Sequence, residues 1–279
     1  MFDPTLHLPV SLAMFQDIFH APSGQEIVRI LFRWAHFVGG ITWIGMLYFF
    51  NLVNVNFMKA LDAPTKKVVV PNLMPKALWY FRWGAVVTVI AGLGYYAMYI
   101  LRGDVINANS DGAGANTWLI LIIWLIIAGV AWAIFAYVLL PNLNKDGKIL
   151  AVATAALVVA LAVVIAVLMI VMTCLVLYVL GTKSNNCDTT GNCVYLGNKT
   201  LSIGVGGGMG ILMLLNVWGI IWPAQKRIIA ATAAGTAPDA ALARRAFLAS
   251  RANAWLSLPM LWFMGTSHGD WVIFGRNSA

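Results

Sequence analysis

Six stretches of this sequence run for at least 18 residues without a single Asp, Glu, Lys or Arg. They cover residues 34–58, 83–101, 112–144, 149–182, 200–225 and 252–269. A charged side chain at the centre of a bilayer is costly, and a helix of about 20 apolar residues crosses the hydrocarbon core. We therefore predict an all-α integral membrane protein, built as a bundle of six transmembrane helices with lipid around it.

The composition excludes an ordinary soluble enzyme. Only 10% of the 279 residues are charged, whereas 61% are hydrophobic. Soluble globular domains carry about 25% charged residues. The net charge of +8 would suggest nucleic acid in a soluble protein, but no basic-aromatic module accompanies it here, and we expect no nucleic-acid partner.

Basic residues are concentrated in alternate loops of the predicted bundle. Segments 59–82, 145–148 and 226–251 hold 12 of the 18 Lys and Arg residues but only 3 of the 10 acidic residues. The positive-inside rule places these loops in the cytoplasm. Both termini are then periplasmic, in a bacterial inner membrane that the chain crosses several times.

We divide the chain into two regions. Residues 1–26 are predicted to form a periplasmic surface segment, and residues 27–279 the six-helix transmembrane domain. Within cytoplasmic loop 226–251, an Ala- and Arg-rich stretch after Pro238 predicts a short helix.

Two histidines are the leading candidates for ligands. His36 lies about one turn inside the first predicted span, and His268 at the outer end of the last. Arg29, Arg33, His36 and Gly40 share one helical stripe. A haem needs an axial imidazole, flat space beside it and a cation for its propionates, and this stripe offers all three. We therefore predict a haem b whose iron is bound by His36 from the stripe and by His268 from the last span. The alternatives are an imidazole that hydrogen-bonds a neighbouring helix and arginines that reach lipid phosphate.

The fifth predicted span opens with a glycine-rich run, Gly204–Gly210. Small residues let helices approach closely, and the alternative is clearance for a macrocycle, with Met209 or Met264 as a possible sixth ligand. In the outer loop 183–199, Cys187 and Cys193 are expected to form a disulfide, because that side of the membrane is oxidising.

Four blocks of sequence carry a family resemblance. The first reads Trp34-Ala-His36 and then Gly40-Ile-Thr-Trp-Ile-Gly45. The others span residues 75–84, 216–226 and 250–268. In this order the blocks resemble the PuuD-type bacterial membrane urate oxidases.

The resemblance implies a membrane redox domain that passes electrons to a periplasmic cytochrome c, which in the family is often fused at the C-terminus. This sequence has no C-x-x-C-H haem motif, so we expect a separate cytochrome c. The substrate would be urate or a similar small molecule, and Arg82 and Arg251 are possible contacts for an anionic purine. The rival interpretation is a non-catalytic subunit, haem-holding, pigment-holding or structural, of a larger respiratory or photosynthetic complex.

Overall fold

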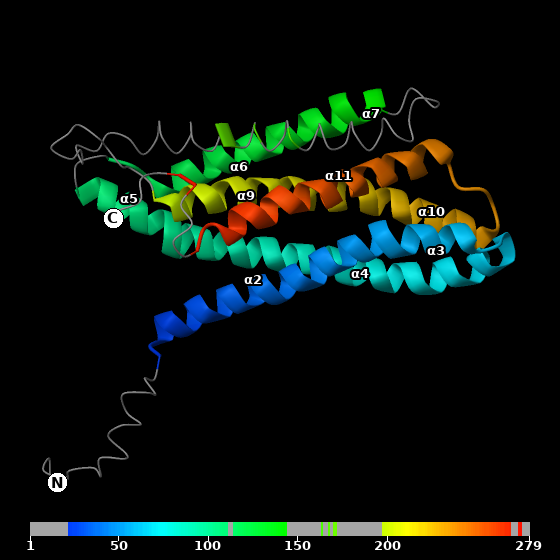
Figure 1. Cartoon of the computed structure of the whole chain (residues 1–279), viewed down its shortest axis with the longest axis horizontal. Helices are drawn as coiled ribbons and strands as arrows, with labels where there is room; N and C mark the ends of the chain where they lie inside the picture. The colour runs from blue at the N-terminus through cyan, green and yellow to red at the C-terminus, as the bar shows by residue number, and fades with distance from the viewer. Residues whose placement is uncertain are drawn as a thin grey trace, which may run out of the picture.

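The computed structural model describes residues 22–110, 114–143, 163, 167, 170, 171, 197–268 and 273–274. Every regular element in these residues is a helix. The helices lie side by side along one long axis (Figure 1).

The α-helices are α2 Gly24–Tyr48, α3 Val55–Ala60, α4 Ala63–Tyr95, α5 Arg102–Ser110, α6 Thr117–Ile134, α7 Leu140–Leu143, α9 Asn198–Asn216, α10 Trp222–Ala234 and α11 Ala240–Gly265. Four π-helical segments join some of them end to end: η1 Phe49–Asn54, η2 Tyr96–Leu101, η3 Phe135–Leu139 and η4 Val217–Ile221. The joined helices Gly24–Ala60, Ala63–Asn107, Thr117–Leu139 and Asn198–Ala234 are long and apolar enough to cross a membrane.

Polar side chains define where the helices begin. Ser23 and Glu26 form a reciprocal capping box at the start of α2, so each satisfies a backbone N–H that the first turn leaves free. Asp62 caps α4 by accepting a hydrogen bond from the backbone N–H of Thr65, and Asp239 caps α11 in the same way. These caps set the two connections Leu61–Asp62 and Gly235–Asp239.

Four of the six predicted spans correspond to these long helices. The predicted fourth span, 149–182, lies almost entirely outside the described residues. The predicted sixth is the second half of α11, which is not among the four candidates found in the described part of the chain. Asn253 and Ser257 place buried polar groups in this half of α11, and Arg244 and Arg245 place charges in its first half. The count of six and the periplasmic termini stay predictions.

The loop predicted over residues 59–82 is instead mostly helical. Only two residues separate α3 from α4, and α4 runs unbroken through Pro71 and Pro75. The positions of charges indicate where a chain leaves the bilayer, but a capped helix continues into water beyond that point. Likewise, the short helix predicted in loop 226–251 is the first part of α11.

The two basic connections meet at one end of the bundle (Figure 1). Gly235 ends α10 with a φ of +74°, a left-handed conformation that glycine adopts without strain. A Cβ at this position would lie 3.2 Å from Nζ of Lys67 on α4. The two basic connections therefore lie at the same end of the bundle, as the predicted alternation of basic loops requires.

The outer surface of the bundle is apolar. Trp34, Ile41 and Ile90 expose 62%, 73% and 63% of their surface, although each lies within a long apolar helix. An exposed apolar surface of this kind would be unfavourable in water. It fits contact with lipid.

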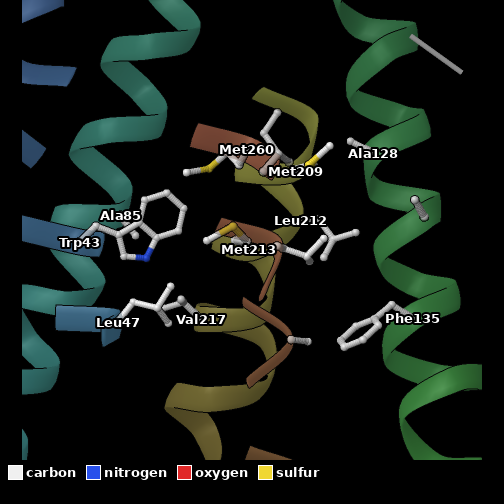
Figure 2. Close-up of a cluster of buried hydrophobic side chains, with 14 of the residues drawn as sticks. Trp43, Leu47, Ala85, Ala128, Phe135, Met209, Leu212, Met213, Val217 and Met260 are labelled. Carbon is white, nitrogen blue, oxygen red and sulfur yellow. The ribbon is translucent and has the colours of Figure 1, made fainter. Parts of the chain in front are cut away.

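The core is built around α9, most of whose residues are buried. Figure 2 shows side chains from the surrounding helices converging on Met209, Leu212 and Met213 of α9. Trp43 and Leu47 reach this cluster from α2, and both are almost completely buried. This cluster packs together the helices that carry the candidate site at their ends remote from the two basic connections.

Glycines allow the closest helix contacts. A Cβ at Gly39 would lie 2.7 Å from Oγ1 of Thr88, and one at Gly84 would lie 3.2 Å from the backbone N of Trp43. Either contact is too short for an unshifted side chain, so these two glycines permit the tight α2–α4 pairing. The pairing fixes the register between α2 and α4, which matters for His36 below.

A buried polar network joins α9, α11 and α6. Nδ2 of Asn216 donates to Oδ1 of Asn253 (2.8 Å), and Nδ2 of Asn253 donates to the backbone carbonyl of Met213 (3.0 Å). Nε1 of Trp132 donates to Oδ1 of Asn216 (3.0 Å). Buried amides are stable only when they are paired in this way. Two of the sequence blocks, 216–226 and 250–268, therefore meet in the core.

Candidate functional site

A cavity of about 650 Å³ lies between α2, α4, α6, α9 and α11. It occupies the ends of these helices that are remote from the two basic connections, because its lining comes from residues 33–45, 88–96, 203–211 and 260–268, together with Trp124. Cofactor and ligand pockets typically enclose about 300–1,000 Å³. The walls are mainly aliphatic, aromatic and glycine residues, and they carry few polar side chains.

His36 of α2 lines this cavity and is half-buried. Its Nδ1 lies 2.8 Å from the backbone carbonyl oxygen of Thr88 on α4. In the neutral tautomer with the proton on Nδ1, the ring donates to this carbonyl and keeps the Nε2 lone pair for another partner. Metal-ligating histidines characteristically make this hydrogen bond.

Gly92, one turn beyond Thr88 on α4, makes room for the His36 ring. A Cβ at residue 92 would lie 2.5 Å from Nδ1 and 2.8 Å from Cε1 of His36. Any larger residue must displace the imidazole or the helix. The position of the imidazole therefore depends on α4 as much as on α2.

His268 lines the same cavity from the turn that follows α11. Its Nδ1 lies 2.7 Å from Oγ of Ser267 and 3.3 Å from the backbone carbonyl oxygen of Met264. The ring is exposed, whereas that of His36 is half-buried. The structure thus brings the two predicted histidines to one cavity, each with Nδ1 beside a backbone carbonyl.

Only part of the predicted stripe on α2 lines the cavity. Arg33 and Gly40 line it, with the guanidinium carbon of Arg33 5.9 Å from the centre of the Phe37 ring. Arg29 lies one turn further out, beyond the lining, and its guanidinium carbon is 6.0 Å from the centre of the Tyr99 ring. Arg33 is thus the cation of this stripe that stands at the cavity.

The two methionines considered as ligands lie in different places. Met264 lines the cavity, as does Met260. Met209 is completely buried in the core cluster and is not part of the lining (Figure 2). A sixth ligand from this pair would have to be Met264.

The glycine-rich run of α9 both packs against α11 and borders the cavity. A Cβ at Gly206 would lie 3.1 Å from the backbone oxygen of Met260, so this glycine packs α9 against α11. Gly207 and Gly210 line the cavity. Adjacent glycines on one helix therefore face different neighbours.

The remaining predicted residues lie elsewhere or outside the described chain. The guanidinium carbon of Arg82 sits 3.4 Å from the centre of the Trp222 ring, and that of Arg251 sits 5.3 Å from the centre of the Phe247 ring. Neither lines the cavity. Cys187 and Cys193 fall outside the described residues. The described residues hold no group of three or more His, Cys, Asp or Glu that could bind a metal ion.

Sequence reasoning did not identify Thr88, Gly92 or Trp124 as cavity residues. Thr88 and Gly92 contact His36 across 52 and 56 positions of sequence, and only the helix register brings them together. The available signal was the pair Gly92 and Gly94 within an apolar span, since glycine in a helix often marks a close approach.

The fold and the cavity define a multi-pass helical membrane protein with a histidine-lined apolar pocket near one end of the bundle. The family model described as urate oxidase N-terminal matches residues 60–278, and the chain belongs to this family. The resemblance found in the sequence is thereby confirmed; the first block, which contains His36, precedes the matched residues. Comparisons with curated proteins and with solved structures gave no match.

Proposed function

We propose that this protein is a membrane redox protein of the urate oxidase type that holds haem b in the cavity and passes electrons to a separate periplasmic cytochrome c. The observation that carries the proposal is the placement of His36 and His268 on one apolar cavity, each with Nδ1 beside a backbone carbonyl. His36 and His268 would hold the haem iron, and the haem would supply one-electron transfer when bound.

The residues present fit a flat apolar group. Gly45 and Gly265 both line the cavity and are exposed, and a Cβ at either would meet no described atom within 4 Å, so the cavity opens to the outside of the bundle there. The space beside them is therefore open. Aromatic and aliphatic walls suit a macrocycle, and the few polar groups are those that a haem requires.

Each polar residue then has a distinct task. The Thr88 carbonyl would fix the tautomer and the orientation of the His36 ring and raise the basicity of Nε2. Arg33, one turn outward, would pair with propionate carboxylates through charge-assisted hydrogen bonds. Trp124 and Tyr96 line the cavity and are buried, and they would keep water out.

The position of the cavity favours a periplasmic electron acceptor. It lies at the end of the bundle opposite the basic connections, which the positive-inside rule assigns to the cytoplasm. A haem at the outer face would be accessible to a soluble cytochrome c. The inner membrane and this orientation belong to the proposal.

The proposed substrate is urate or a similar small purine anion. Family membership supports this choice. Arg82 and Arg251 are the proposed anion contacts. Their helices, α4 and α11, both border the cavity, but neither arginine lines it. Each guanidinium instead lies near an aromatic ring, so substrate binding and the haem site can be tested separately.

The test uses membranes that contain the full chain. We expect urate consumption coupled to reduction of added cytochrome c. His36→Ala should abolish both reactions, and Arg82→Ala should weaken urate consumption while retaining haem. Lys76→Ala, which removes a charge from the same helix, α4, serves as the control. If the haem-loaded protein turns over no urate and is recovered stoichiometrically in a larger complex, the subunit interpretation replaces the enzyme.

A further inference from the structure

A second cavity of about 190 Å³ lies between α10 and the first turns of α11. Arg227 of α10 and Arg245 of α11 both line it. The other walls are small or apolar and include Gly219, Pro223 and Leu242. Two cations thus face a space too small for a macrocycle.

Arg245 has a buried donor without an acceptor. Its Nε is buried and has no hydrogen-bond partner among the described residues, whereas one terminal nitrogen, Nη2, lies 3.5 Å from the backbone oxygen of Ala136. A guanidinium carries five donor N–H groups and no acceptor. Leaving such a donor unpaired away from water is unfavourable. Because the Arg245 side chain also lines the cavity, an acceptor there would give the guanidinium a partner.

The depth of the cavity in the bundle indicates what that acceptor is. Arg245 and Gly265, which lines the larger cavity, are 20 residues apart on the continuous helix α11. At about 1.5 Å per residue, 20 residues span about 30 Å, which matches the thickness of a bilayer hydrocarbon core. With Gly265 near the outer face, this separation would put Arg245 at the headgroup level on the opposite side.

We propose that this cavity binds the phosphate group of an anionic membrane lipid, held by Arg227 and Arg245. Guanidinium groups pair with phosphate through two parallel hydrogen bonds. Basic pockets between helices on the cytoplasmic side are suited to lipid headgroups. A free phosphate offers the same chemistry, so the experiment must separate the two sources. This site is independent of haem binding and of urate oxidation.

The experiment measures thermal unfolding of the purified full chain in neutral detergent. Phosphatidylglycerol, phosphatidylcholine and inorganic phosphate are titrated separately, and an apparent dissociation constant is taken from the rise in Tm. We expect phosphatidylglycerol to stabilise the protein, and Arg245→Gln and Arg227→Gln each to weaken its binding about tenfold or more. Arg227 is exposed, so Arg227→Gln should leave the fold intact.

Lys226→Gln is the matched control, because it removes an adjacent charge that does not line the cavity. This variant should bind phosphatidylglycerol as the parent does. Equal weakening in Lys226→Gln, or unchanged binding in both arginine variants, would overturn the proposal. Stabilisation by inorganic phosphate equal to that by phosphatidylglycerol would overturn the assignment to lipid.

Discussion

Replacing Gly92 by alanine tests how α4 positions the imidazole of His36. The new methyl carbon would lie 2.5 Å from Nδ1 of His36, far inside van der Waals contact. The ring must therefore shift and lose its 2.8 Å hydrogen bond to the Thr88 carbonyl. The backbone of α4 is helical at this position, so alanine itself introduces no backbone strain.

The size of the effect follows from the lost hydrogen bond. Overpacking a filled core costs about 1–3 kcal/mol, but Gly92 and His36 both line the cavity, so the ring relieves the clash by moving into it. The hydrogen bond that it loses contributes about 0.5–1.5 kcal/mol. We therefore take about 1 kcal/mol as the loss to the aligned state, which in binding corresponds to about fivefold weaker affinity.

The assay is a titration of haem b into the purified apoprotein, followed by its absorbance. Gly129→Ala is the control, because a Cβ at residue 129 of α6 would meet no atom within 4 Å and this residue does not line the cavity. The control should bind haem as the parent does. Parental affinity in Gly92→Ala would refute the argument that α4 positions His36.

Three further predictions concern stability, topology and the outer loop. Asn253→Ala removes the acceptor of Asn216 and the donor to the Met213 carbonyl, so it should lower the free energy of unfolding by about 1–3 kcal/mol. Asn56→Ala on the exposed surface should not lower it, and equal thermal stabilities of the two variants would contradict this prediction. A reporter active only in the periplasm should work when fused at the C-terminus and be silent when inserted after Gly235, and the reverse pattern would invert the topology. Cys187 and Cys193 should resist thiol labelling until a reductant is added; labelling without reductant would exclude the disulfide.

The sequence predicts the long apolar helices well because the cost of burying charge is a local property of each window. It fails where helices extend beyond the apolar windows. Residues 63–82 contain enough charges to look like a loop, yet α4 begins at Ala63 because Asp62 caps it. Hydropathy alone does not detect such a charged extension of a helix.

The candidate site was predictable in part. The polar residues His36, Arg33 and His268 are conspicuous in apolar surroundings, and all three line the cavity. Thr88 and Gly92 were missed because their role depends on the register between α2 and α4, which close packing at Gly39 fixes.

The glycine-rich run illustrates the same limit. Whether a glycine packs a helix or borders a cavity depends on its direction around α9. Gly206 faces α11, and its neighbour Gly207 faces the cavity. A count of glycines in the sequence cannot separate these roles.

The reduced-minus-oxidised absorption spectrum of the purified protein, compared with its histidine variants, tests the central proposal most directly. We expect a b-type spectrum in the parent, its loss in His36→Ala, and a high-spin, five-coordinate haem in His268→Ala. An unchanged b-type spectrum in both variants would contradict the account and place the haem ligands elsewhere.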